Sequence, residues 1–473
     1  MQGMPDHQAL LMEASRHAST ILRNAKQSRS LLIVTHLDAD GLASASLIGK
    51  ALMRKRATFQ VRVVSDLTPK TIRSVREEGH DFLIFTDLGS GSGQMMKDLF
   101  GEDWLVIDHH QTNRLEFAFL NVFNAWKFGY DGGTEVCSTG MAYLVTSQMD
   151  ASNIDLSWLA VVAALADRQD AGEEKSLTGL NKMISEESVK LGALEVKKDL
   201  ALYGRETRPI HQALASTTTP FLPNLTGNPD TCLAILTAAG IKLKENDRWR
   251  TISELTEDEK AKMLEVIITH MAAGNEATHT VGELFAKVYT LIQEDEFSPL
   301  RDAREFGTLL NACGRLRRAG MGIAVCLGDR DRNLRDAETI ISEYRQTLSR
   351  YIKTILTEQN RIFEKTHYTL IMSDGLVDEN LVGAVCSIVG GLPKFLSKPL
   401  LVRTTTLEGD VKVSARLNQI FSPRINLGKT LAFAAESCNG VGGGHAAAAG
   451  ARIPSEHAED FQRIVDEKLL EIE

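Results

Sequence analysis

Short apolar runs alternate with helical patterns between Leu31 and about Asp170. Four of these runs end at an acidic residue or a histidine, and in chain order they are LLIVTH, FQVRVVSD, DFLIFTD and WLVIDHH. Near-continuous runs of Val, Ile and Leu, separated by helical patterns, are typical of parallel strands that helices cover on both faces. The pattern therefore predicts an α/β domain that is built on a mostly parallel sheet.

Helical periodicity replaces this pattern between residues 171 and 330. One clear helix begins at the capping-box residues Thr256 and Glu259, whereas an apolar run into Gly328 is strand-like. A long helical pattern without proline or glycine follows, and a second α/β pattern begins at YTLIMSDG. We therefore expect an α/β domain at residues 1–170, a helical insertion that returns to this core at 171–330, a connecting helix at 331–365 and a C-terminal α/β domain at 366–473.

Composition and charge narrow the class of protein. The chain has 473 residues, of which 43% are hydrophobic and 24% charged, as expected for a soluble protein of two or three domains. No apolar run could span a membrane or serve as the core of a signal peptide, and six scattered cysteines without a CxxC pair indicate reduced thiols. We therefore expect a cytoplasmic protein with no membrane partner. The net charge of −9 counts against tight binding of duplex nucleic acid, but it suits an enzyme that holds a few nucleotides in one cleft.

Acidic residues and histidines gather where the predicted strands end. The first strand leads into His36, Asp38 and Asp40, and extended backbone would direct these alternate side chains to one face. A single aspartate in such a place is usually a turn former. In open parallel sheets, however, ligands bind at the carboxyl ends of the strands. The other residues that we expect at this edge are Asp87, Asp108, His109, His110 and, at the end of an apolar helix, Asp167.

This group of carboxylates and imidazoles would be electrostatically untenable without bound cations. Carboxylate and imidazole ligands together suit Mn²⁺ or Mg²⁺, and the histidines favour manganese. So many acidic ligands indicate two ions roughly 4 Å apart, an arrangement that activates water for in-line displacement at a phosphoryl group. The residues therefore predict a two-metal phosphoester hydrolase.

A glycine-rich segment near the end of the chain has a chemistry of its own. Gly442, Gly443 and Gly444 would let backbone N–H groups approach a phosphate, to which His445 could donate a hydrogen bond. Arg416, on the strand-like segment VKVSARL, offers a bidentate donor to the same kind of group. Plain turns and surface arginines produce similar patterns, so these residues alone leave both interpretations open.

Four of the segments described above resemble the motifs of the DHH phosphoesterase superfamily, namely THLDADG, DLGS, IDHH and ALADRQD. VKVSARLN and NGVGGGHAAAAGARIP resemble the DHH-associated substrate-binding domain. FGYDGGTEVCSTGMAYLV and REFGTLLNACGRLRRAGMGIAVCLGD are similar to archaeal RecJ-like nucleases in particular. The resemblance covers the N-terminal third and the last quarter of the chain. It implies a DHH catalytic domain at residues 1–170 and a DHH-associated domain at residues 366–473.

The resemblance also implies roles for individual residues. Asp87 would bridge two ions, of which one is bound by His36 and Asp38 and the other by Asp40, His109 and Asp167. His110 would face the scissile phosphate, and Asp108 would orient a ligand histidine. Arg416, Gly442, Gly443, Gly444 and His445 would bind substrate. Because His36 lies two residues before Asp38, whereas many relatives have four, a supporting role for His36 stays open.

Three functions stay open on these grounds. The leading hypothesis is an Mn²⁺- or Mg²⁺-dependent exonuclease that acts at an end of single-stranded DNA or RNA in archaeal replication or repair. A second is a phosphodiesterase of dinucleotides and short oligonucleotides. A third is a replisome scaffold similar to eukaryotic Cdc45, with the GINS complex as its partner, although the complete ligand set favours retained activity. The arginines at 315, 317 and 318 are a candidate contact for the incoming strand, whereas cleavage polarity and oligomeric state are left undetermined.

Overall fold

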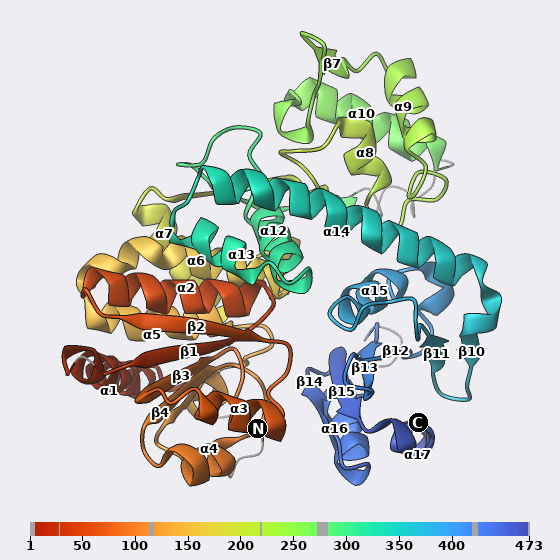
Figure 1. Cartoon of the computed structure of the whole chain (residues 1–473). Helices are drawn as coiled ribbons and strands as arrows, with labels where there is room; N and C mark the ends of the chain where they lie inside the picture. Colours follow the sequence, from red (N-terminus) through yellow and green to blue (C-terminus); the bar gives the residue numbers. More distant parts are fainter. Residues whose placement is uncertain are drawn as a thin grey trace. The chain divides into compact units, whose positions relative to one another are not determined.

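The computed structural model describes residues 5–27, 29–112, 118–217, 220–271, 282–418 and 424–471 (Figure 1). The chain divides into two compact units, Met1–Ile341 and Ser342–Glu473. The boundary between the units falls within the long helix α14 (Arg332–Thr357). In the described part of the chain, no helix is both long enough and apolar enough to cross a membrane.

The first unit contains the parallel sheet that the sequence predicts. All neighbouring strands run parallel, in the order β2-β1-β3-β4-β5. In chain order the strands are β1 (Leu31–His36), β2 (Phe59–Val64), β3 (Phe82–Thr86), β4 (Trp104–Asp108) and β5 (Val122–Asn124). Because β1, β3 and β4 are adjacent and parallel, their carboxyl ends lie side by side at one edge.

Both faces of the sheet are buried, because alternate residues of each strand enter two separate hydrophobic cores. In β1, Leu31 and Ile33 pack into one core, and Leu32 and Val34 pack into the other. Burial of each such side chain stabilises the fold by about 1.5–3 kcal/mol. The first core includes residues of α1 (His7–Lys26), α2 (Ala39–Arg54) and α5 (Ser138–Met149), and the second includes residues of α3 (Pro69–Glu77) and α4 (Gly93–Phe100) (Figure 1).

The middle of the first unit is mostly helical, as predicted. Its helices include α6 (Ser157–Ala166), α7 (Gly179–Lys190), α8 (Ile210–Ala215), α9 (Pro229–Ala238) and α10 (Glu257–His270). The capping box of α10 is confirmed. The Thr256 N–H donates to the Glu259 carboxylate at 3.0 Å, and the Glu259 N–H donates to the Thr256 hydroxyl at 3.3 Å.

Two longer strands also occur in this middle region, where the sequence predicts none. β6 (Leu194–Leu200) and β9 (Phe285–Leu291) pair antiparallel along their whole length. β6 has the sequence LEVKKDL, and its charged residues hide the weak alternation of Leu and Val. Its partner lies far along the chain, so a local pattern does not reveal the pairing.

The apolar run into Gly328 is helix α13 (Ala319–Leu327), and the strand-like interpretation of this run is wrong. A short apolar run does not distinguish a strand from a helix, because it lacks the polar positions whose spacing would reveal either period. The helix ends at Gly328, whose φ of 112° is the left-handed conformation that favours glycine after a helix.

Helix α12 (Ala303–Arg315) supports the loop that follows β1. Gly314, near its end, packs so closely on this loop that a Cβ atom would lie 1.6 Å from the carbonyl oxygen of Leu37. One turn earlier, the Asn311 side chain accepts a hydrogen bond from the Ala39 N–H at 3.2 Å. α12 therefore holds in place the segment THLDADG, which contains Asp38 and Asp40.

The second unit contains a six-stranded sheet in the order β10-β11-β12-β13-β15-β14, in which only the β11–β12 pair is parallel. The strands are β10 (Ile362–Glu364), β11 (Thr369–Met372), β12 (Leu400–Thr405), β13 (Val411–Arg416), β14 (Val441–Gly444) and β15 (Ala448–Ile453). Helices α15 (Val382–Val389), α16 (Leu427–Ser437) and α17 (Ala458–Leu470) accompany the sheet. The helical pattern that the sequence extends to residue 365 ends at Thr357 in α14, because the residues of β10 instead pair with β11.

We expect Gly314→Ala to destabilise the first unit by about 1–3 kcal/mol, because the added methyl group would overlap the Leu37 carbonyl and displace the loop after β1. Thermal unfolding of the full chain measures this loss. Gly320→Ala is the matched control in α13, since a Cβ atom there has no neighbour within 4 Å. Equal melting temperatures for the two variants would contradict the role of Gly314.

Candidate metal centre

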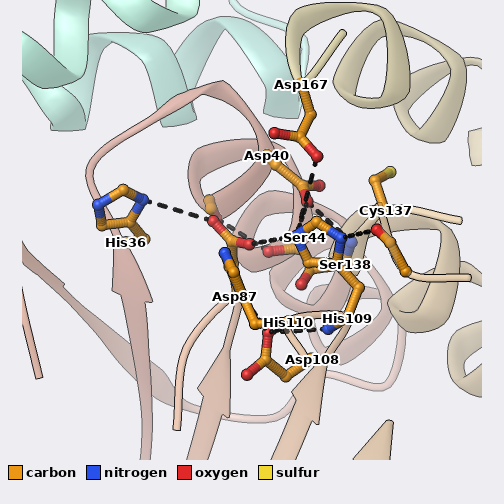
Figure 2. Close-up of polar contacts among 12 residues, drawn as sticks. His36, Asp40, Ser44, Asp87, Asp108, His109, His110, Cys137, Ser138 and Asp167 are labelled. Atoms are coloured by element: carbon orange, nitrogen blue, oxygen red, sulfur yellow. Dashed lines mark hydrogen bonds and ion pairs between the residues drawn. The ribbon is translucent and has the colours of Figure 1, made fainter. Parts of the chain in front are cut away.

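The predicted residues of the first unit converge at the carboxyl edge of the parallel sheet (Figure 2). They come from the ends of adjacent strands and from the start or end of the helices beside them. His36 ends β1, Asp38 and Asp40 begin α2, Asp87 follows β3, Asp108 ends β4 and precedes His109 and His110, and Asp167 caps the end of α6.

Asp38 and Asp40 reach this edge by a different path from the one predicted. The extended strand stops at His36, so the expected alternation over three positions does not continue. Asp38 is instead the N-cap of α2 and accepts the Gly41 N–H at 3.1 Å, while Asp40 lies in the first helical turn. A Cβ atom at Gly41 would lie 2.3 Å from the His36 carbonyl oxygen, so the tight turn requires glycine. The helix N-terminus favours both carboxylates.

Asp87 occupies the centre of the group. Its φ of 63° is unusual for a residue other than glycine, and its side chain is only 2% exposed. Neither carboxylate oxygen forms a hydrogen bond with the described residues. One oxygen lies 3.6 Å from Nδ1 of His36, and the other lies 3.4 Å from Nε2 of His109. A buried carboxylate without donors is costly, and a divalent cation would satisfy it.

The ring of His109 is held in one orientation. Nδ1 donates a hydrogen bond to the carbonyl oxygen of Gly132 at 2.5 Å, which directs Nε2 toward three carboxylates. Nε2 lies 3.7 Å from Asp40, 3.4 Å from Asp87 and 3.9 Å from Asp167. With its proton on Nδ1, the neutral imidazole presents the lone pair of Nε2 to this group, as a metal ligand must.

Asp40 is fixed by the start of α5. Its two oxygens accept the backbone N–H groups of Ser138 and Thr139, both at 2.8 Å, and the Thr139 hydroxyl donates a third bond at 2.6 Å. These donors satisfy the buried carboxylate and hold it in one orientation. Sequence reasoning assigned Ser138 and Thr139 no role, although both lie in the segment FGYDGGTEVCSTGMAYLV.

Asp108 orients the second histidine of its motif. It accepts Nδ1 of His110 at 2.8 Å and the backbone N–H groups of Ser90 and His109 at 3.1 and 2.8 Å. The ring that it holds is therefore that of His110, which is 40% exposed, whereas the Gly132 carbonyl holds the ring of His109. The sequence predicts that Asp108 orients a ligand histidine. Asp108 accepts a hydrogen bond from the backbone N–H of His109, but the ring that it orients is that of His110.

Two groups of possible ligand atoms at this edge have no residue in common, and a third group, of Asp87, Asp108, His109 and His110, overlaps both. The first group consists of His36, Asp38 and Asp87, and the second of Asp40, His109 and Asp167, with the atoms of each group within 4.8 Å of one another. One oxygen of Asp87 faces His36 of the first group, and the other oxygen faces His109 of the second group. The donor set of carboxylate and imidazole fits a hard or borderline divalent cation.

Burial and crowded carboxylates shift the pKa values of these groups in the metal-free protein. Burial, together with the charges of Asp38 and Asp40, raises the pKa of Asp87 to about 7. Burial opposes protonation of His36, but the charges of Asp38 and Asp87 outweigh this effect and raise the pKa of His36 to about 10. Burial also raises the pKa of Asp167 to about 6.

The predicted substrate-binding residues lie at one end of the sheet in the second unit. Arg416 ends β13 and pairs with Ala448, while Gly444 ends β14 and pairs with the next residue of β15. The Arg416 guanidinium donates to the Ser387 hydroxyl and to the Ala415 carbonyl, both at 2.7 Å, and the His445 N–H donates to the Ala448 carbonyl at 2.7 Å. The strand pairing thus brings Arg416 and His445 to the same sheet end.

The glycines before His445 serve different needs. A Cβ atom at Gly442 would lie 2.7 Å from the Leu431 carbonyl oxygen, so this glycine lets α16 pack on β14. Gly444 has a φ of 129°, which side-chain-bearing residues rarely adopt. A Cβ atom at Gly443 would have no neighbour within 4 Å, so this position is the one at which a ligand could approach the backbone.

Matches to known protein families agree with this architecture. Residues 30–166 match the DHH family N-terminal domain, residues 202–285 the DHH-CID domain and residues 376–471 the DHHA1 domain. The three domains follow one another along the chain, which therefore belongs to the DHH phosphoesterase superfamily and has a RecJ-like fold. An uncharacterized protein of Methanocaldococcus jannaschii is 29% identical over 446 residues, which is 92% of each chain.

Solved structures share the fold at low sequence identity. Cdc45 from Entamoeba histolytica matches 97% of this chain and 99% of its own, with a TM-score of 0.64 and 13% identity. RecJ from Thermus thermophilus in complex with Mn²⁺ matches the whole chain with a TM-score of 0.57 and 14% identity. This chain spans only 56% of that RecJ. Another structure, of exonuclease RecJ bound to manganese, matches 97% of this chain and 94% of its own, with a TM-score of 0.54 and 14% identity.

We expect the affinity for Mn²⁺ to rise between about pH 6 and pH 9, with release of protons on binding. The raised pKa values of Asp87 and His36 mean that protons occupy these groups near neutral pH and compete with a cation. As pH rises through about 7, Asp87 loses its proton and the competition weakens. Calorimetric titration in two buffers of different ionisation enthalpy counts the released protons. A pH-independent affinity without proton release would contradict this assignment.

Proposed function

We propose that this chain is a divalent-metal-dependent phosphodiesterase that removes nucleotides from an end of single-stranded DNA or RNA. The observation that carries the proposal is the buried carboxylate of Asp87. Its two oxygens face two different groups of ligand atoms and form no hydrogen bond with the described residues. This is the geometry expected of a bridging ligand between two cations. Crystal structures of RecJ with Mn²⁺ and with Mg²⁺ support the same kind of cofactor.

The residues around Asp87 would divide between the two cations. Two ions, when bound, lower the pKa of a water and neutralise charge on a phosphodiester. We assign Asp38, with His36 beside it, to one ion, and Asp40, His109 and Asp167 to the other. His36 Nδ1 lies 3.0 Å from Asp38 and 3.6 Å from Asp87, so it is within reach of the same ion as both carboxylates. Mn²⁺ is the expected ion because imidazole ligands favour it over Mg²⁺.

His110 would stabilise charge on the reacting phosphate. Burial opposes its protonation, but the Asp108 carboxylate outweighs this effect and raises the pKa of His110. Its ring stands beside that of His109, with 4.4 Å between the centroids, and is more exposed. A cationic imidazole at this position can donate a hydrogen bond to a phosphate oxygen. This hydrogen bond becomes stronger as negative charge develops on that oxygen.

The second unit would bind the nucleotide chain. Arg416 supplies a guanidinium, His445 an imidazole, and Gly443 an open stretch of backbone, all at one end of the sheet. In the first unit, Arg317 and Arg318 are exposed just after α12, the helix that packs on the loop after β1. Arg317 and Arg318 suit the phosphates of a strand that approaches the carboxyl edge of the first unit.

We expect Asp87→Asn to reduce hydrolysis of a single strand by at least about 10³-fold, because several kcal/mol of transition-state stabilisation depend on the bound metals. The assay uses 5′- and 3′-end-labelled DNA and RNA with Mn²⁺, resolved as a ladder over time. Asp81→Asn is the matched control. Asp81 is exposed and directly precedes the first residue of β3, whereas Asp87 follows its last residue. Substantial residual activity of Asp87→Asn would refute the bridging role. Hydrolysis of dinucleotides and short oligonucleotides, with no ladder from a long strand, would favour a phosphodiesterase of short oligonucleotides.

We expect Arg416→Ala to weaken single-strand binding and to make the dependence of log affinity on log salt shallower by about 0.7, which is the value for one phosphate contact. Fluorescence anisotropy of labelled oligonucleotides at several salt concentrations measures this slope. Lys412→Ala changes a cation nearer the other end of the same strand, β13, and should leave the slope less affected. His445→Ala should raise KM for hydrolysis of the end-labelled strands. Unchanged binding and KM would contradict a role of this sheet end in holding substrate.

A second function, as a scaffold in archaeal DNA replication, is favoured by one observation. The TM-score of 0.64 to Cdc45 covers nearly the whole of both chains. We propose the GINS complex as the partner in that case, and catalysis would not exclude it. Co-elution of the purified chain with GINS from the same source tests this function. The Asp87→Asn variant should retain binding to GINS if the scaffold role is independent of catalysis.

A further inference from the structure

The loop that follows α6 contains a buried amide next to the metal ligands. Gln169 stands two residues after Asp167 and is 0% exposed. Sequence reasoning assigned it no role, although it lies within the segment ALADRQD. A buried amide must find hydrogen-bond partners for both its oxygen and its nitrogen, so its neighbours show what it holds in place.

The nitrogen of this amide contacts two groups that belong to the candidate metal centre. Nε2 of Gln169 donates to the Asp167 carboxylate at 2.8 Å and to the Gly132 carbonyl at 2.9 Å. It also lies 3.2 Å from Nδ1 of His109, which donates to the same Gly132 carbonyl. One side chain thus connects the end of α6 with the histidine that follows β4.

Asn181 of α7 fixes the direction of the amide. Its Nδ2 donates to Oε1 of Gln169 at 2.6 Å, and the Asn181 side chain is itself buried. If the amide were rotated by half a turn, its oxygen would face the Gly132 carbonyl and the Asp167 carboxylate, which are both acceptors. In the observed orientation, the Gln169 nitrogen faces two acceptors and the Gln169 oxygen faces a donor.

The Gly132 carbonyl determines which nitrogen of His109 is left for a metal. Because this oxygen accepts hydrogen bonds from both His109 and Gln169, the proton of the neutral imidazole stays on Nδ1. Nε2 then faces Asp40, Asp87 and Asp167. A Cβ atom at Gly132 would lie 1.8 Å from the His109 carbonyl oxygen. Only glycine at position 132 therefore lets its backbone pack this closely against the backbone of His109.

We propose that Gln169 is a positioning residue that orients His109 and Asp167 together as ligands of one divalent cation. This inference rests on the proposed two-metal function, and it deepens that function by naming what distinguishes the two ion positions. An ion held by Asp40, His109 and Asp167 would depend on the amide network. An ion held by His36 and Asp38 would not, because the hydrogen bonds of Gln169 go to Asp167, Gly132 and Asn181.

The test is the binding of Mn²⁺ to the full chain carrying Gln169→Met, which keeps the length of the side chain and removes both polar groups. We expect one of two Mn²⁺ ions to bind about 10- to 100-fold more weakly, as is typical when a hydrogen-bond partner of a metal ligand is lost. The other ion should bind as in the wild type. Calorimetry and electron paramagnetic resonance of Mn²⁺ measure both affinities without reference to hydrolysis. Raised Mn²⁺ should also restore hydrolysis in this variant.

Asn153→Leu is the matched control, because Asn153 is another amide with 0% exposure in the same unit. Its side chain donates to the Thr146 carbonyl and accepts from Arg54, away from the metal centre. We expect this variant to lower the melting temperature while both Mn²⁺ affinities stay unchanged. Equal weakening of Mn²⁺ binding in the two variants would overturn the inference, since any buried amide would then have the same effect.

Two further measurements separate the inference from the proposed function. Failure of the wild type to bind Mn²⁺ would refute the proposed function, whereas wild-type affinities in Gln169→Met would refute only the role of Gln169. In an Asp167→Asn background, Gln169→Met should weaken binding by less than it does alone, because one of the two contacts of Gln169 is with the Asp167 carboxylate. If Gln169→Met does not fold, Asn181→Leu removes only the restraint on the amide. That variant should weaken the same ion several-fold, and unchanged binding would overturn the inference.

Discussion

Repulsion between carboxylates that are held out of water is the constraint on which the first unit depends. Two unit charges 4 Å apart near a protein surface interact by about 4 kcal/mol, and the energy grows as water is excluded. Asp87 lies between two such groups of carboxylates with only 2% of its side chain exposed. Such an arrangement persists only if the rest of the domain is rigid enough to hold it and if cations or protons compensate the charge.

The scaffold meets this demand with backbone dipoles and close packing. The start of α2 donates to Asp38, and the start of α5 donates to Asp40, so the positive ends of two helices face the acidic group. The parallel sheet, buried on both faces, leaves little room for its strand ends to move. α12 closes on the loop after β1 through Gly314. The metal centre is therefore a property of the whole unit and not of its motifs alone.

Much of this site could be predicted from the sequence because its residues stand at the ends of parallel strands. Neighbouring parallel strands end at one edge of their sheet, and this rule alone predicts that Asp87 and His109 lie close together. Contacts that depend on side-chain amides and carbonyls do not follow from such a rule. Gln169 and Gly132 lie far apart in the chain, and only the packed fold shows that both hold His109.

The errors in the predicted fold have similar physical causes. The helix α13 is a short segment with apolar residues or glycine at every position, so it lacks the polar face by which an amphipathic helix is identified. The charged strand β6 gains its stability from a partner that is distant in sequence, so its own composition says little. The segment from residue 36 to residue 40 changes from strand to helix within a single turn, and spacing alone could not locate that change.

The ribbon of β6 and β9 has a consequence for how this molecule could have arisen. Leu200 pairs with Phe285, so the two ends of the intervening segment lie next to each other. That segment corresponds to the DHH-CID match and has a hydrophobic core of its own. Neighbouring ends allow a self-contained module to be gained or lost without disturbing its host. The β6–β9 ribbon is thus a point at which evolution could insert or remove an entire module without changing the metal centre at the edge of the parallel sheet.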